Sequence, residues 1–220
     1  MGTEVANIVS PFHFCYARSA EDFDVIHREG VNLVIWRREQ EPETAVLVDT
    51  LCAEQDVDVV AVLQAHDPDV WLLLSDLPPG RARDMLAADI GYLAKRFSKL
   101  AEKPALRARL ETVHTDACRL FHVDVASLRL IVTYSGFGTQ WASNDAVRRD
   151  QLTARGRSFE EANLAIVPRP TDIRATRPWW VLLQKGEAYP GNADNGIVHR
   201  SPLIEQTAER RLRLCLDVMR

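Results

Sequence analysis

The stretch S-L-R-L-I-V-T-Y, residues 127–134, alternates in a way that decides the expected fold. In an extended strand, successive side chains point to opposite faces of the sheet. Arg129 and Thr133 then share one face, while Leu130 and Tyr134 lie on the other. The same alternation recurs in further short stretches, which are residues 106–113, 118–124, 179–186 and 211–217. Such a series, separated by Gly, Pro, Asn and Asp, predicts a β-sandwich or barrel.

The first hundred residues have a mixed pattern. Residues 31–36 predict a strand, residues 41–55 predict a helix, and residues 57–63 fit either a strand or a buried piece of helix. The strongest helix is expected over residues 81–102, after the break Pro78-Pro79-Gly80. Its apolar stripe consists of Leu86, Ile90, Leu93, Phe97 and Leu100. Because this stripe needs a partner, we expect the helices to pack on an outer face of the β-structure.

The chain therefore divides into an N-terminal α/β segment, residues 1–104, and a strand-rich part, residues 105–220, which we expect to form one integrated α+β domain. Residues 143–163 interrupt the strands with a polar, arginine-rich excursion. Its arginines are Arg148, Arg149, Arg155 and Arg157. A solvated loop is the simpler interpretation, and a surface for an anionic substrate is the other.

The bulk properties exclude several classes of function. The chain has 220 residues, a formal net charge of −4 and a pI of about 5.9, so no basic footprint for nucleic acid is expected. No apolar run approaches the roughly 18 residues that span a bilayer. The N-terminus does not resemble a secretory signal, so we expect a cytoplasmic protein. The sequence does not indicate an oligomeric state.

The cysteines, Cys15, Cys52, Cys118 and Cys215, contain no C-x-x-C pair. Zinc-ribbon and redox-motif interpretations therefore fail on spacing. We expect the thiols to be reduced and buried as small hydrophobic side chains.

The motif that points to chemistry is F-H-V-D, residues 121–124, together with the distal N-G-I-V-H-R-S-P, residues 195–202. On a strand, His122 and Asp124 would project to the same side, and a neighbouring strand would bring in His199. Two imidazoles and one carboxylate can bind a transition metal and leave its other positions open.

Simpler interpretations of these residues remain open. H-x-D arises often by chance, and a strand-edge pair without a metal is the alternative for His122 and Asp124. Cys118 lies four residues before His122, so it could be a soft ligand that favours zinc, although a buried apolar filler is the simpler role.

An ordered set of motifs runs along the chain: the N-terminal N-L-V-I-W-R-R, then C-R-L-F-H-V-D, R-L-I-V-T-Y-S-G-F-G-T-Q-W, L-L-Q-K-G, G-I-V-H-R-S-P and R-L-R-L-C-L-D. With this set the chain resembles the bacterial DUF1826 family of uncharacterised proteins. The order of the motifs is also similar to that of the Fe(II)/2-oxoglutarate-dependent oxygenases. This second resemblance implies a double-stranded β-helix (a jelly-roll, cupin-like fold) over about residues 105–220.

The resemblance to the oxygenases also implies roles for individual residues. His122, Asp124 and His199 would bind Fe(II), and Arg210 or Arg211 would hold the far carboxylate of 2-oxoglutarate. Adjacent residues of a strand point to opposite faces, so only one of these two arginines can do so; a solvated charge is the alternative for each. Tyr134 would hydrogen-bond the co-substrate or belong to the core. Arg200 would point away from the metal and form a structural ion pair, and Asp217 is most simply a charge near the chain end.

Three functions compete at this point. The first is an Fe(II)/2-oxoglutarate-dependent oxygenase that acts on a small molecule or another unknown substrate. The second is a non-redox protein, linked to metal homeostasis, that holds Zn(II) or another divalent metal on the same ligands. The third is a β-sandwich that binds a partner and no metal.

Overall fold

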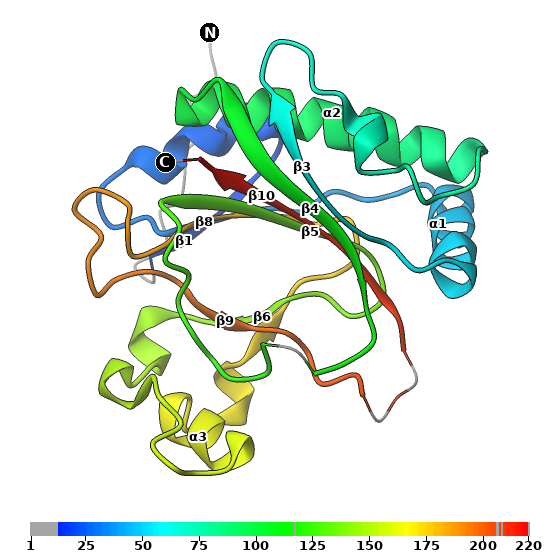
Figure 1. Ribbon diagram of the computed structural model, residues 1–220. Helices are drawn as coiled ribbons and strands as arrows, with labels where there is room; N and C mark the ends of the chain where they lie inside the picture. The colour runs from blue at the N-terminus through cyan, green and yellow to red at the C-terminus, as the bar shows by residue number, and fades with distance from the viewer. Residues whose placement is uncertain (1–12, 117, 206, 208, 220) are drawn as a thin grey trace, which may run out of the picture.

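A computed structural model describes residues 13–116, 118–205, 207 and 209–219, and its larger sheet occupies the centre of the molecule (Figure 1). Within these residues the larger sheet has the strand order β1-β2-β8-β5-β10-β4-β3. Its strands are β1 (Phe14–Ala17), β2 (Leu33–Trp36), β3 (Asp58–Gln64), β4 (Ala105–Val113), β5 (Leu128–Ser135), β8 (Val181–Lys185) and β10 (Arg211–Val218). Neighbouring strands are antiparallel, apart from the parallel pair β1 and β2.

The smaller sheet lies opposite and has the order β7-β6-β9. Its strands are β6 (Gln140–Ala142), β7 (Arg174–Ala175) and β9 (Val198–Arg200). His122 extends this sheet through a single antiparallel bridge to His199.

From β4 onward the chain passes back and forth between the two sheets. It runs from β4 to the bridge at His122, back to β5, across to β6 and β7, back to β8, across to β9, and back to β10. This alternating path is that of a double-stranded β-helix, so the predicted fold class is confirmed. The ambiguous residues 57–63 form β3 rather than a helix.

Helices cover the outer face of the larger sheet. They are η1 (Ala20–His27), α1 (Pro42–Glu54), η2 (Val70–Leu72) and α2 (Arg81–Ala101). The predicted apolar stripe of α2 is buried with Leu130, Val132 and Tyr134 of β5 in one core. Full burial of each large apolar side chain contributes about 1.5–3 kcal/mol, so this contact fixes the sheet beneath the helix.

The excursion between β6 and β7 covers the outer face of the smaller sheet. It contains η3 (Asn144–Ala146), η4 (Arg149–Gln151), α3 (Phe159–Ile166) and η5 (Pro170–Asp172). The α3 helix begins at a capping box formed by Ser158 and Glu161. Its Ile166 packs with Phe121 and Val198, which anchors the excursion to the sheet that carries the histidines.

The sequence prediction was wrong for residues 118–124, which form no regular strand. This segment crosses between the sheets instead. The backbone of His122 exchanges hydrogen bonds with His199 of the smaller sheet, and the carbonyl of Asp124 accepts one from the Glu187 amide, just after β8 of the larger sheet. The sequence of this segment alternates as a strand does, but the backbone partners of His122 and Asp124 belong to different sheets.

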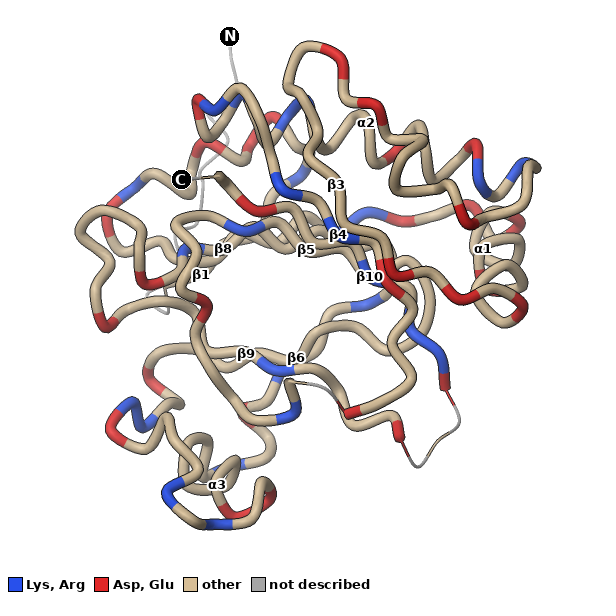
Figure 2. Tube along the Cα trace, viewed as in Figure 1, with Lys and Arg blue, Asp and Glu red and all other residues tan. Residues whose placement is uncertain are grey.

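The strands β1, β2 and β3 come from the first 104 residues yet pair within the same sheet as β4 to β10. The division into residues 1–104 and 105–220 stays a prediction about organisation. Within the described residues, no helix combines the length and apolar character needed to cross a membrane. Figure 2 shows arginines and lysines along the strands of the larger sheet, including β4.

Candidate metal centre

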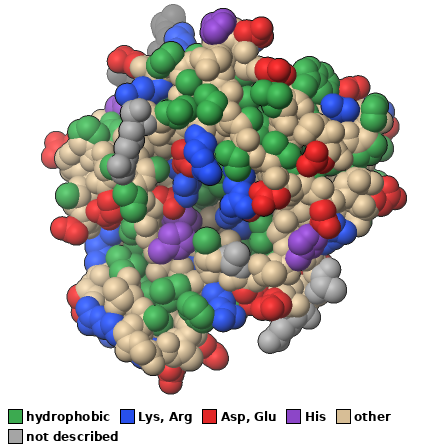
Figure 3. Space-filling model, in the orientation of Figure 1, with side chains coloured by type: hydrophobic (Ala, Val, Ile, Leu, Met, Phe, Trp, Pro, Cys, Tyr) green, Lys and Arg blue, Asp and Glu red, His purple; other side chains and the backbone are tan. Residues whose placement is uncertain are grey.

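The space between the two sheets opens as a hollow on the face shown in Figure 3, where arginine and histidine side chains gather. This cavity has a volume of about 190 Å³. Charged side chains from both sheets line it: Arg107, Arg109, Glu111, Asp124, Arg129, Arg200, Arg213 and Asp217, together with His122 and His199.

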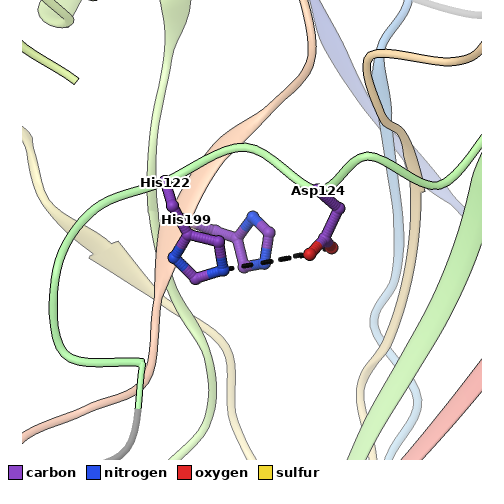
Figure 4. A group of neighbouring side chains, drawn as sticks. All are labelled: His122, Asp124 and His199. Carbon is purple, nitrogen blue, oxygen red and sulfur yellow. Dashed lines mark ion pairs between the residues drawn. The ribbon is translucent and has the colours of Figure 1, made fainter. Parts of the chain in front are cut away.

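His122, Asp124 and His199 converge in this cavity (Figure 4). One ligand atom from each residue lies within 4.8 Å of the others. His199 Nε2 is 3.3 Å from Asp124 Oδ2, and His122 Nε2 is 3.8 Å from Asp124 Oδ1. Donors that share a metal at about 2.1 Å are themselves roughly 3.0–3.4 Å apart, so the His199–Asp124 separation already fits a shared ion and the wider separations would have to shorten.

The protonation of both imidazoles suits metal binding. His122 Nδ1 lies 2.9 Å from the carbonyl oxygen of Leu120, and His199 Nδ1 lies 3.2 Å from that of Ile197. A carbonyl oxygen can only accept, so Nδ1 carries a proton in both rings, and in the neutral imidazole the lone pair is on Nε2. Burial lowers the pKa of His199 to about 4, so this imidazole is neutral near pH 7.

Asp124 is fixed by two neighbours. Arg129 Nη1 donates to Asp124 Oδ1 at 2.5 Å, and Gln184 Nε2 donates to Asp124 Oδ2 at 2.6 Å. Burial alone would raise the pKa of the Asp124 carboxyl, but the charge of His199, when that imidazole is protonated in acid, and the charge of Arg129 lower it. The carboxylate is therefore ionised and oriented before any metal binds.

Arg129 is itself held by Asp217, whose Oδ1 and Oδ2 accept from its Nε and Nη2 at 2.6 and 2.9 Å. Asp217 is buried, so its expected role as a simple charge near the chain end is wrong. Arg129 and Gln184 were not assigned a metal-site role from the sequence. The only local signal was the period-two pattern that placed Arg129 on the face opposite Leu130.

The two candidate clamp arginines have different environments. Arg210 points outward, where it pairs with Asp56 and donates to the carbonyl of Ala53 at 2.7 Å. Arg211 is fully buried, and neither Asp nor Glu lies within 4.0 Å of it among the described residues.

Among the described residues, Arg211 donates only to hydroxyl groups, namely Thr133 Oγ1 at 3.0 and 3.2 Å, Thr139 Oγ1 at 2.6 Å and Ser201 Oγ at 3.3 Å. Thr139 and Ser201 also line the metal cavity. Burial, helped by repulsion from Arg213, lowers the pKa of Arg211 to about 9. A buried guanidinium without an anionic partner is costly, so this site suits a carboxylate ligand.

Two other residues, Tyr134 and Arg200, do not have the contacts that the sequence predicted. Tyr134 is on the helix-covered face of β5, where its hydroxyl donates to Asp89 Oδ2 at 2.7 Å, so it does not reach the metal cavity. Arg200 forms no ion pair with a described residue; its Nε donates to the neutral Gln140 Oε1 at 2.8 Å.

Cys15, Cys52 and Cys215 are buried, as expected, but Cys118 is exposed. It lines the metal cavity without belonging to the three-residue group. The interpretation of Cys118 as a buried filler is therefore wrong.

Fold and site together define the class of this protein: a double-stranded β-helix with two histidines and one aspartate gathered between its sheets. The donor set fits a divalent transition metal, because two lone-pair nitrogens and one ionised carboxylate face the same point. Residues 17–217 match the model of the family described as "Protein of unknown function (DUF1826)", and the chain belongs to that family. No curated protein matches the sequence.

Several solved structures are similar in their backbone. The auxin-oxidising dioxygenase DAO1 of Arabidopsis thaliana, in a 2-oxoglutarate complex, has a TM-score of 0.49 and 9% sequence identity. The match covers 94% of this chain and 91% of the DAO1 chain. A rice dioxygenase for auxin oxidation has a TM-score of 0.47 and 11% identity, with coverages of 86% and 73%. A Pseudomonas putida prolyl-4-hydroxylase has a TM-score of 0.45 and 12% identity, with coverages of 91% and 98%.

Proposed function

We propose that this protein is an Fe(II)- and 2-oxoglutarate-dependent oxygenase. The observation that carries the proposal is Arg211, a fully buried guanidinium that among the described residues has only hydroxyl partners, two of which, Thr139 and Ser201, line the cavity of the two-histidine, one-aspartate group. A dicarboxylate satisfies both features, because one end can bind the metal and the other can pair with the arginine.

Each residue has a defined task in this proposal. Nε2 of His122, Nε2 of His199 and a carboxylate oxygen of Asp124 would hold the iron and leave further positions open. Arg129 and Gln184 keep the carboxylate oriented. Arg211, with Thr139 and Ser201 beside it, would bind and orient the far carboxylate of 2-oxoglutarate. The iron, when bound, supplies oxygen activation coupled to decarboxylation of the co-substrate.

The competing proposal is a non-redox metal protein. It draws on the same donor set, because two imidazoles and a carboxylate also suit Zn(II). It leaves Arg211 without an anion, which is why we rank it second.

An anaerobic titration separates the two proposals. Fe(II) is added to the metal-free protein, then 2-oxoglutarate, and the optical absorption is recorded. We expect the absorption to change on addition of 2-oxoglutarate in the native protein and not in Arg211→Met, while both bind one iron. A native protein that binds metal but shows no response to 2-oxoglutarate would favour the non-redox protein.

A further inference from the structure

A second hollow adjoins the metal cavity on the side of the smaller sheet. It has a volume of about 450 Å³ and lies over α3. Its exposed apolar side chains are Phe159, Leu164 and Leu203. We call it the α3 groove. Figure 3 shows hydrophobic side chains gathered over α3, below the hollow that carries histidine and arginine side chains.

The α3 groove adjoins the metal cavity. Arg200 lines both hollows. A third, smaller hollow lies beside both, because it shares Cys118 with the metal cavity and Phe159 with the α3 groove. A molecule lying over α3 therefore borders the metal cavity.

The sizes of the two hollows favour a substrate outside the metal cavity. Pockets for drug-sized ligands have volumes of about 300–1,000 Å³. The metal cavity, at about 190 Å³, is smaller than that range even before a co-substrate enters, and the α3 groove, at about 450 Å³, lies within it.

Arg200 supplies the charge at the junction. Its guanidinium lies 4.5 Å from the ring centre of Phe121, and its Nε donates to Gln140. Its two terminal nitrogens form no hydrogen bond with any described residue, and they present a fork that matches a carboxylate. Asp116, Glu160 and Arg119 also line the groove, so with Arg200 its charges balance, and a singly charged carboxylate suits it better than a phosphate dianion.

We propose that the α3 groove binds the apolar body of an organic monocarboxylate whose carboxylate pairs with Arg200. If the proposed oxygenase function holds, on which this step rests, that molecule is the substrate class. Phe159, Leu164 and Leu203 exclude water from the apolar body, and Arg200 holds the carboxylate at the border with the metal cavity.

Octanoate is a suitable probe, with 1-octanol as the uncharged comparison and acetate as the comparison without an apolar body. Binding to the full chain is measured by isothermal titration calorimetry. We expect octanoate to bind the native protein and acetate not to bind. Arg200→Met keeps an apolar stem over Phe121 and should weaken octanoate about tenfold while leaving 1-octanol unchanged, because a hydrogen bond to a charged group is lost. Arg200→Lys keeps the charge without the fork and should weaken octanoate less.

Matched controls separate the groove from general charge effects. Arg169→Met removes the same charge from a side chain that is 73% exposed and outside the groove, and should leave octanoate binding unchanged. Leu164→Gln preserves helix propensity and should weaken octanoate and 1-octanol alike.

Equal octanoate affinity in the native protein and in both Arg200 variants would overturn the inference, as would the absence of octanoate binding at millimolar concentration. A native dimer that Leu164→Gln converts to a monomer would instead identify the groove as a contact between copies, and would also overturn it. Repeating the titration with Asp124→Ala distinguishes the two proposals. If this variant loses the metal but still binds octanoate in a way that depends on Arg200, the result concerns the metal site alone and the groove proposal stands.

Discussion

Arg129 joins two buried carboxylates: its Nη1 donates to Asp124 at 2.5 Å, and its Nε donates to Asp217 at 2.6 Å. The proposed metal ligand on the segment between the sheets is thereby tied to β10 at the far end of the chain. A ligand carboxylate positioned in this way loses little conformational entropy when a metal binds, since its orientation is already set.

Replacing Asp217 by Asn should lower metal affinity without removing a ligand. Arg129 would lose its bidentate partner and would no longer hold Asp124 in one orientation. Loss of such a supporting contact typically costs about 10–100-fold in metal affinity. Metal titration measures the effect, and Asp58→Asn is the control, because Asp58 pairs with Arg109 at the exposed edge of the same sheet. Equal affinities in the native protein and Asp217→Asn would show that Arg129 does not position the ligand.

Asp124→Ala should remove the metal. The variant keeps both imidazoles but loses the one anionic donor, and a buried site of two neutral nitrogens binds a dication poorly. Elemental analysis of protein purified without chelator gives the stoichiometry. Asp145→Ala, which removes an exposed carboxylate of η3, should bind as much metal as the native protein. Unchanged stoichiometry in Asp124→Ala would contradict the assignment of this ligand.

Arg211→Met should weaken 2-oxoglutarate binding and spare the metal. A charge-assisted hydrogen bond contributes about 1.5–3 kcal/mol, so affinity should fall by about one to two orders of magnitude. Arg210→Met is the matched control, because Arg210 points away and pairs with Asp56. Calorimetric titration of 2-oxoglutarate into the metal-loaded protein measures the difference. A larger loss of 2-oxoglutarate affinity in Arg210→Met than in Arg211→Met would contradict the assignment of Arg211 as the residue that binds the far carboxylate.

The metal-free protein should lose stability in acid. His199 has a folded pKa of about 4, below the ordinary value of 6.5, so the unfolded chain binds a proton more readily between these values. Unfolding free energy should therefore fall as pH decreases from about 6.5 to about 4. The lowered pKa of Asp124 acts in the same direction at more acidic pH. Denaturant unfolding across this range measures the slope, which should be smaller in His199→Gln; an identical slope would show that His199 does not cause it.

The sequence alone predicted those helices and strands whose patterns are set by local periodicity. The stripe of α2 and the alternation of β5 are encoded within single elements, so each could be recognised without knowledge of its partners. The convergence of His122, Asp124 and His199 was also confirmed as a structural cluster, since motif order had placed the three residues together.

Contacts across long sequence separations could not be predicted in the same way. Arg129 and Asp217 are 88 residues apart, and Gln184 and Asp124 are 60 apart, so only the register of β5, β8 and β10 brings them together. The same limit applies to Arg200, whose neutral partner Gln140 lies on a neighbouring strand. Residues 118–124 had the alternation of a strand but bridge two sheets, a difference that no local pattern encodes.

The most direct measurement of the central claim is a crystal structure of the protein grown anaerobically with Fe(II) and 2-oxoglutarate. We predict one metal bound by Nε2 of His122, Nε2 of His199 and a carboxylate oxygen of Asp124, at roughly 2.0–2.2 Å. One end of 2-oxoglutarate should bind that metal, and the other should pair with Arg211. A metal bound elsewhere, or a 2-oxoglutarate molecule that leaves Arg211 with hydroxyl partners alone, would contradict the account.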